Sequence, residues 1–280
     1  MSPDGKLTFG PLGDHWVYDK STKTYDLTRG NNSSSKPLKV QTTQGPPDTN
    51  ILISPSRTVL VIVDMQNFFL HPSCRSHPDG LTAVTPLLTA IEHCRKVGIQ
   101  VVWLNWGLTD ADLAAMPAGV LRGFAKAVIA ADEDETATAT AAAGLGVDLG
   151  DGKGRCLVAG EWNAEIYAPL AEVVLDDDVH CAKNRMSGLW CEGQPLWGHL
   201  SGTGEGDGDG DKKKTLLFAG VNTDQCVLGT LTDAYNAGWD CVLVEDCCAT
   251  TTVGAREVCL ANVGKNYGFV IDSRTIAEAS

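Results

Sequence analysis

Short, continuous apolar runs recur along most of this chain and alternate with segments of helical periodicity. The apolar runs cover residues 58–63, 100–104, 173–182, 215–219, 240–244 and 267–271, the third less regular than the rest. Helical segments cover residues 82–97, 223–237 and 253–264, with Gly98 and Gly238 placed to end the first two. Continuous apolar runs are typical of strands buried on both faces. Strands alternating with helices predict an α/β fold, a three-layer α/β/α sandwich with a central, mainly parallel sheet.

The two ends of the chain differ in pattern. Residues 1–56 are polar and rich in Gly, Ser, Thr and Pro, with one short aromatic patch at 16–18, and they predict an extended N-terminal arm. Residues 57–280 carry the alternating pattern and predict one α/β domain. Within that domain, segments near 131–154 and 201–214 are low in complexity, and we expect them to be surface insertions.

Composition narrows the class of protein. Of 280 residues, 43% are hydrophobic and 20% charged, which is enough apolar material for a sizeable core. The net charge of −13 repels phosphate backbones, so we do not expect a nucleic-acid partner. No apolar run reaches the roughly 18 residues that span a bilayer, and no signal-peptide pattern opens the chain. Ten cysteines without a regular disulfide framework indicate a reducing compartment, so we expect a cytoplasmic protein without a membrane partner.

Candidate chemistry follows the ends of the predicted strands, where open parallel sheets bind their ligands. Asp64 comes directly after the first apolar run, where a carboxylate is costly to bury unless it has a partner or a task. A helix cap or an ordinary loop acid is an equally simple interpretation of that position. Lys183 follows the third run, and taken alone it could be a solvated lysine.

Cys226 is the cysteine with the clearest reason to be reactive. It lies in the first turn of the helix that follows the fourth strand, where unpaired N–H groups lower a thiol pKa. A buried structural thiol is the alternative. Together the three residues predict acyl transfer, in which Lys183 holds Cys226 as thiolate while Asp64 accepts the thiol proton and returns it to the leaving amine. Backbone N–H groups near Cys226 would bind the oxyanion, and water would hydrolyse the thioester.

The segments 63–66, 183–188 and 220–227 resemble the motifs of the isochorismatase-like cysteine hydrolases. That family includes nicotinamidase, N-carbamoylsarcosine amidohydrolase and ureidoacrylate amidohydrolase. The resemblance covers roughly residues 56–275 and implies the isochorismatase-like hydrolase fold. It also implies a catalytic triad of Asp64, Lys183 and Cys226, and a cis peptide bond between Val221 and Asn222 that aims N–H groups at the oxyanion.

The chain departs from the nicotinamidases at their metal site. Those proteins carry an Asp-x-His motif after the second strand, whereas residues 103–107 here contain neither histidine nor carboxylate. The six histidines are scattered without ligand spacing. We therefore expect no metal and no cofactor, and nicotinamide is a poor substrate candidate.

The nearest resemblance is to the ureidoacrylate-type amidohydrolases, and it implies four substrate-binding residues. Asn67 belongs to the segment after the first strand, and Asn105 and Trp106 form an Asn-Trp pair after the second. Asn105 would offer a hydrogen-bonding amide and Trp106 an aromatic wall, although ordinary packing explains both equally well. Arg185 would pair with a substrate carboxylate, or else form an external salt bridge.

Three hypotheses of function remain open from the sequence. The first is a hydrolase that cleaves a C–N bond of a small amide, ureido or carbamoyl compound through a Cys226 thioester. The second is an isochorismatase-type hydrolase that cleaves a vinyl ether by acid catalysis from Asp64 and does not need the cysteine. The third is a non-enzymatic member that binds a ligand or senses redox state through Cys226. The resemblance also implies a homodimer or homotetramer.

Overall fold

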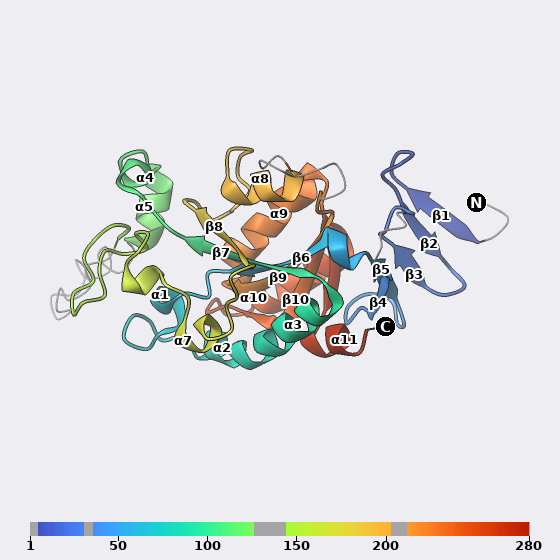
Figure 1. Cartoon of the computed structure of the whole chain (residues 1–280), viewed down its shortest axis with the longest axis horizontal. Coiled ribbons are helices and arrows are strands. Elements are labelled where there is room, and N and C mark those ends of the chain that lie inside the picture. Colours follow the sequence, from blue (N-terminus) through green and yellow to red (C-terminus); the bar gives the residue numbers. More distant parts are fainter. Residues whose placement is uncertain (1–4, 31–35, 126–143, 203–211, 280) are drawn as a thin grey trace.

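The centre of the protein is a six-stranded parallel sheet, seen in the computed structural model, which describes residues 5–30, 36–125, 144–202 and 212–279 (Figure 1). The strand order is β11-β10-β9-β6-β7-β8, and every neighbouring pair is parallel. The strands are β6 (Thr58–Val63), β7 (Gln100–Trp106), β8 (Val179–Lys183), β9 (Thr215–Val221), β10 (Asp240–Ala249) and β11 (Gly268–Ile271). Each predicted apolar run therefore contains or overlaps one strand, and the predicted α/β fold is confirmed.

Helices cover both faces of this sheet and complete the three layers. Helices α3 (Val84–Val97) and α11 (Ser273–Ala277) pack together on one face, and α9 (Leu228–Ala237) and α10 (Ala255–Asn262) lie on the other (Figure 1). Helix α3 turns Leu87, Ile91 and Cys94 inward, which is the spacing of one helical face. Gly98 ends it in the left-handed conformation, with a φ of 83°, as the sequence predicted.

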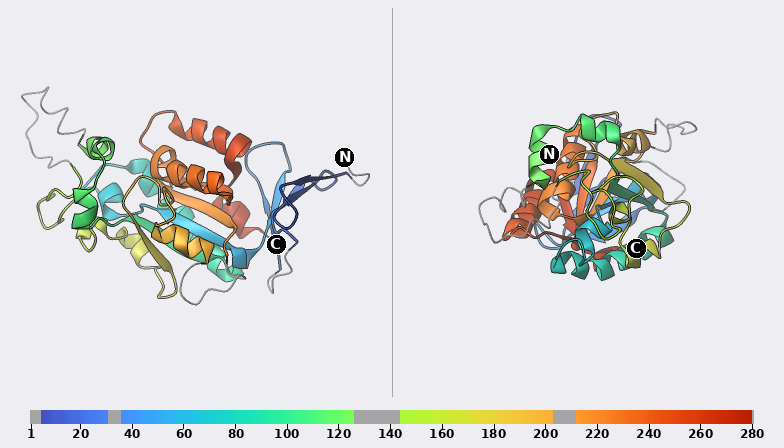
Figure 2. Two further views of the ribbon diagram at one scale, coloured as in Figure 1. Left: turned by 90° about the horizontal axis from the view of Figure 1, so that it is seen from above. Right: turned by 90° about the vertical axis from the view of Figure 1, so that its left-hand side faces the viewer.

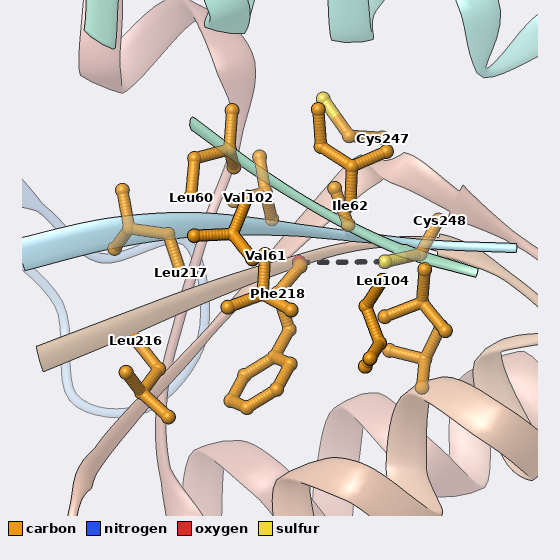
Figure 3. Close-up of a cluster of buried hydrophobic side chains, with 14 of the residues drawn as sticks. Leu60, Val61, Ile62, Val102, Leu104, Leu216, Leu217, Phe218, Cys247 and Cys248 are labelled. Atoms are coloured by element: carbon orange, nitrogen blue, oxygen red, sulfur yellow. Dashed lines mark hydrogen bonds between the residues drawn. The ribbon is translucent and has the colours of Figure 1, made fainter. Parts of the chain in front are cut away.

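The sheet interior is apolar on both faces. All six residues of β6 and all seven of β9 are buried, which is why these segments show no alternation of polar and apolar positions. Figure 3 shows side chains of β6, β7 and β9 projecting to both sides of the sheet. Cys248 lies among them and donates its S–H to the carbonyl oxygen of Phe218 at 3.6 Å, so this thiol is part of the core.

Short helices in the connections were not predicted, because four to seven residues are too few to show helical periodicity. They are α1 (Asn67–Leu70), α2 (Pro78–Thr82), α4 (Asp110–Ala114), α5 (Ala118–Phe124), α7 (Ala168–Ala171) and α8 (Pro195–Ser201). Among the described residues, no helix is both long and apolar enough to cross a bilayer. Of the two expected insertions, residues 131–143 and 203–211 lie outside the described part of the chain.

Where we expected an extended N-terminal arm, the structure has a second sheet. Its strands are β1 (Lys6–Phe9), β2 (Trp16–Asp19), β3 (Thr24–Asp26), β4 (Leu38–Gln41) and β5 (Asn50–Ile53), in the order β1-β2-β3-β5-β4. The expectation of an extended segment is corrected on this point. These strands have only three or four residues, and most of their side chains are half-buried or exposed, so no long apolar run marks them.

A buried ion pair joins this N-terminal sheet to the amino ends of the parallel strands. The Arg29 guanidinium donates to both carboxylate oxygens of Asp240, the first residue of β10, and the side chains are only 6% and 2% exposed. Trp16 donates its indole N–H to the same carboxylate at 2.8 Å. At the sheet edge, the Thr43 N–H donates to the Val270 carbonyl oxygen in β11 at 2.8 Å. The N-terminal sheet thus lies at the end of the central sheet where the strands begin (Figures 1 and 2).

Arg29→Ala is expected to lower the free energy of unfolding by about 3–5 kcal/mol, because it leaves the buried Asp240 carboxylate without its cation. Urea denaturation followed by tryptophan fluorescence measures the change. Lys23→Ala is the matched control, since Lys23 pairs with Asp48 between two turns beside the same sheet but both side chains are exposed. The control should change stability by less than about 1 kcal/mol. Equal effects of the two substitutions would show that the Arg29–Asp240 pair does not hold the sheets together.

Candidate active site

Three residues from separate connections meet at the carboxyl ends of the parallel strands. Asp64 follows β6, Lys183 is the last residue of β8, and Cys226 lies in a π-helical turn (Thr223–Val227) between β9 and α9. Lys183 Nζ lies 3.0 Å from Asp64 Oδ2, and neither side chain is exposed. Cys226 is 7% exposed, and its thiol interacts with the Asp64 carboxylate. The structure therefore brings together the thiol, carboxylate and ammonium that the sequence singled out.

The backbone at the strand ends sets the position of Asp64. Its φ of 53° is in the left-handed region, which aspartate occupies more readily than most residues. The neighbouring strand approaches closely at Gly220, which pairs with Val63. A Cβ on Gly220 would lie 2.0 Å from the Val63 carbonyl oxygen, and the φ of 116° also demands glycine. Glycine at this position thus allows β9 to lie against the residue before Asp64.

Lys183 is held on three sides. Besides Asp64, its ammonium donates to the Arg185 carbonyl oxygen at 3.2 Å and lies 4.0 Å from the centre of the Trp106 ring. A cation over an indole face is an attractive contact that strengthens when water is excluded. Trp106 is only 1% exposed, so its ring supports the ammonium, while a contact with substrate stays a prediction.

Gln66 fixes the strand that carries Trp106, a role that the sequence did not reveal. Its side-chain oxygen accepts the Trp106 N–H at 3.0 Å, and its amide N–H donates to the Trp106 carbonyl oxygen at 2.7 Å. The same amide donates to the Ala164 carbonyl oxygen at 2.6 Å. Gln66 is completely buried, and these three bonds satisfy its polar atoms. Its position two residues after Asp64 was the only signal of a role in the site.

Burial raises the pKa of the Asp64 carboxyl above its usual range. The positive charge of Lys183 opposes this effect, and hydrogen bonding to Cys226, Lys183 and the Trp106 backbone opposes it further. The carboxylate therefore keeps a counter-ion but has more affinity for a proton than an exposed aspartate. That is the property required of a group that accepts a proton and returns it.

Burial also raises the pKa of the Cys226 thiol, to about 12, and the negative charge of Asp64 adds to the increase. The positive charge of Lys183 opposes both effects only in part. The prediction that the helix start lowers this pKa is therefore wrong for the free protein. The physical reason is that burial and the neighbouring Asp64 carboxylate raise the pKa more than the Lys183 charge lowers it, so Cys226 rests as a thiol.

The loop before Cys226 carries the predicted oxyanion residues. The bond between Val221 and Asn222 is cis. The Asn222 carbonyl oxygen accepts the N–H groups of Gln225 at 3.0 Å and Val227 at 3.3 Å, which closes the turn around Cys226. The Asn222 side chain is held by His77, whose Nε2 lies 2.6 Å from Asn222 Oδ1. Sequence analysis missed His77, because nothing in its spacing from other polar residues marks a contact across 145 positions.

Two of the predicted substrate-binding residues, Asn67 and Asn105, have other neighbours in the structure. Asn67 is 5% exposed and donates its side-chain N–H to the Trp162 carbonyl oxygen at 2.9 Å. Asn105 pairs with Ala182, whereas Trp106 pairs with Lys183, so the Asn105 side chain points to the other face of the sheet. Asn105 and Trp106 are both among the residues that line a cavity of about 170 Å³. Contact of Asn67 and Asn105 with substrate stays a prediction.

Arg185, the fourth predicted substrate-binding residue, is half-buried, and its contact with substrate stays a prediction. Its guanidinium lies 5.1 Å from the centre of the Trp190 ring and donates to the Asn184 carbonyl oxygen at 2.7 Å and towards the Met116 sulfur. Among the described residues it lies within ion-pair distance of no carboxylate, but its charge contributes to the lowered pKa of Asp112, so the alternative of an external salt bridge stays open. Among all the residues that the structure describes, no three His, Cys, Asp or Glu side chains are grouped to hold a metal ion.

Comparison with known proteins identifies the family of the chain. The family model described as the Isochorismatase domain matches residues 58–275, which begin just after the N-terminal sheet. An isochorismatase family protein from Desulfovibrio vulgaris is 21% identical with a TM-score of 0.59, covering 79% of this chain and 97% of its own. A cysteine hydrolase from Pseudomonas syringae is 19% identical with a TM-score of 0.58, covering 87% of this chain and 99% of its own.

An N-carbamoylsarcosine amidase from Thermoplasma acidophilum is 20% identical with a TM-score of 0.53, and the match covers 78% of this chain and 96% of that one. At these identities the structures show a shared fold. The family model matches well over half of the chain, including the segments that carry Asp64, Lys183 and Cys226. The protein therefore belongs to the isochorismatase family of hydrolases.

Proposed function

We propose that this protein hydrolyses a C–N bond of a small amide, ureido or carbamoyl compound through a thioester on Cys226. The observation that carries the proposal is the completely buried Asp64–Lys183 ion pair, whose charges act on the buried Cys226 thiol. A buried ion pair is costly to desolvate, and it is weak evidence for a stabilising role. The likeness of the fold to that of an N-carbamoylsarcosine amidase supports a carbamoyl group as the target.

The first step is a proton transfer from Cys226 to Asp64. Before it, the site holds one ammonium, one carboxylate and a neutral thiol, so its charges sum to zero. Afterwards it holds the ammonium, a thiolate and a neutral carboxylic acid, and the sum is again zero. Because burial disfavours either anion, the transfer exchanges one buried anion for another beside the same cation. Lys183 thereby stabilises the thiolate at the moment it forms.

The thiolate then attacks the substrate carbonyl carbon, and the C=O electron pair moves to the oxygen. N–H groups of the loop before Cys226 would donate to that oxyanion. Collapse expels the amine, which takes the proton from Asp64 and leaves a thioester on Cys226. Asp64, again a carboxylate, removes a proton from water, which attacks the thioester and releases the acid and the free thiol. The cycle needs no redox partner and returns every group to its starting state.

A carboxylate on the substrate would be bound by Arg185, whose guanidinium has a fork of donors suited to that group. Arg185 supplies its carbonyl oxygen to Lys183, so its side chain begins next to the reacting groups. The ureidoacrylate-type resemblance supports the same class, a ureido or carbamoyl acid. Arg185→Gln is expected to raise KM for such acids by about tenfold, with a much smaller change for the corresponding uncharged amides.

The test is ammonia release from a panel of ureido acids, carbamoyl amino acids and simple amides. Wild type, Cys226→Ala and Arg185→Gln are measured side by side. Release that depends on Cys226 supports the proposal, and a KM effect of Arg185→Gln restricted to acids supports the substrate class. Release that persists at the wild-type rate in Cys226→Ala would refute the thioester mechanism.

A second candidate function is hydrolysis of a vinyl ether by acid catalysis. The observation in its favour is the raised pKa of Asp64, because a carboxyl group that holds its proton more tightly can donate it to an enol ether. In this reaction Cys226 is dispensable and Asp64 is not. Turnover of isochorismate by Cys226→Ala, and not by Asp64→Asn, would favour this candidate over the first.

A further inference from the structure

His77 bridges two parts of the site that are far apart in sequence. It is 3% exposed and lies at the start of α2, in the connection that follows Asp64 and α1. Its ring contacts Asn222, which is 9% exposed and opens the turn that carries Cys226. The segment bearing the proton acceptor is thus tied to the segment bearing the nucleophile.

The hydrogen bonds determine which ring nitrogen of His77 carries the proton. Nδ1 accepts the Gly80 backbone N–H at 2.9 Å, so it presents a lone pair and carries no hydrogen. The proton of the neutral ring is therefore on Nε2, which donates to Asn222 Oδ1 at 2.6 Å. That bond also sets the Asn222 amide, with its oxygen towards His77. Both polar atoms of the imidazole are satisfied, as buried polar groups require.

The ring has little freedom to leave this position. A Cβ on Gly80 would lie 2.9 Å from His77 Nδ1 and 2.7 Å from a Leu70 methyl group, so glycine lets the α2 backbone close against the ring. As the N-cap of α2, His77 also holds the first turn of that helix through the Gly80 N–H. The imidazole therefore transmits the position of one backbone segment to the Asn222 side chain.

The contact of His77 with Asn222 can affect the reaction because Asn222 closes the turn that carries Cys226. The Asn222 carbonyl oxygen accepts the Gln225 and Val227 N–H groups on either side of Cys226. Rotation of Asn222 would shift these bonds and with them the thiol and the nearby N–H donors. Displacement of a reacting group by about 1 Å can cost roughly 100-fold in rate.

We propose that His77 is a positioning residue, which acts through Asn222 to hold the Cys226 turn in its reactive geometry. The inference rests on the proposed function for its effect on turnover. The competing view is that His77 serves only as the cap of α2. The two views predict opposite orders of activity for two substitutions, because asparagine and glutamine each reproduce one nitrogen of the ring.

His77→Asn keeps an acceptor for the Gly80 N–H, since asparagine is a favoured N-cap, but loses the donor to Asn222. His77→Gln places an amide N–H near the position of Nε2 and loses the cap. A positioning role predicts that kcat falls at least about tenfold in His77→Asn, with KM within about twofold, and stays within about threefold of wild type in His77→Gln. Asp272→Ala, which removes the N-cap of α11, is the control for loss of a cap and should leave kcat unchanged.

Hydrogen exchange of the Gln225 and Val227 amides gives a readout that needs no substrate. Exchange is expected to be at least about fivefold faster in His77→Asn than in wild type and His77→Gln. Wild-type kcat or exchange in His77→Asn, or an equal loss in both variants, would overturn the proposal. If His77→Asn does not fold, Asn222→Ala removes the acceptor instead, and unchanged exchange at the two amides in that variant would overturn it. If wild type turns over no compound, the proposed function fails, and the exchange experiment still decides the role of His77.

Discussion

Cys226→Ala is expected to reduce amide hydrolysis by roughly 10³-fold or more, because no other group among the described residues of the site can form the thioester. Asp64 and Lys183 remain, so substrate binding should survive and the loss should fall on kcat. Progress curves for ammonia release, with titrated enzyme, measure the effect. The side chain is small and its removal from a polar turn should leave the fold intact.

Cys248→Ala is the matched control for this prediction. Cys248 is also buried, and burial also raises its pKa, but its thiol donates to the Phe218 carbonyl oxygen within the core. The control should keep wild-type kcat at some cost in stability, because it leaves a small cavity. Full turnover by Cys226→Ala, or an equal loss of kcat in the control, would contradict the assignment of Cys226 as nucleophile.

Asp64→Asn is expected to change hydrolysis and thiol reactivity in opposite directions. Hydrolysis should fall by about 10²–10⁴-fold, since the proton acceptor and donor is lost. Alkylation of Cys226 by iodoacetamide should become faster, because the negative charge of Asp64 raises the thiol pKa and the positive charge of Lys183 then acts unopposed. The reaction requires thiolate, so each unit by which the pKa falls increases the rate about tenfold at a fixed pH below it.

The pH dependence of Cys226 alkylation shows in which direction each substitution shifts the thiol pKa. With a thiol pKa of about 12, the rate of Cys226 alkylation in wild type should keep rising from pH 7 to pH 10. In Asp64→Asn the same curve should lie at lower pH, and in Lys183→Met it should lie at higher pH. Mass spectrometry of the peptide that contains Cys226 separates this thiol from the other nine cysteines. Slower alkylation in Asp64→Asn than in wild type would show that the carboxylate does not control the thiol.

Most of the central sheet was predictable because strands such as β6 and β9 are continuous apolar runs, whereas β8 alternates between buried and exposed positions and was predicted less clearly. The same rule failed for the N-terminal sheet, whose strands have only three or four residues and few fully buried positions. Strand β2 shows the difference, since all four of its residues are only half-buried. Burial of the side chains in such a strand depends on the segments packed against it, so the sequence of the strand alone does not predict it.

Within the site, proximity was more predictable than electrostatics. Asp64, Lys183 and Cys226 follow strands of one parallel sheet, so their meeting at one edge follows from topology. Their catalytic roles stay predictions. The direction of the Cys226 pKa shift depends on how completely packing excludes water, which no local pattern of residues reports. The contact of His77 with Asn222 depends on the path of the loop between α1 and α2. The role of Gln66 depends on hydrogen bonds to the backbone of Trp106, 40 residues away, which only the folded structure reveals.

The way the N-terminal sheet lies along β11 has a consequence for aggregation. An open edge strand presents unpaired N–H and C=O groups, which can recruit a strand from another molecule. Here the Thr43 N–H occupies the Val270 carbonyl oxygen, and the rings of Trp16 and Tyr25 contact Phe269 on the same strand. The added sheet thus shields an outer strand of the hydrolase fold from intermolecular pairing, at the end of the molecule away from its chemistry.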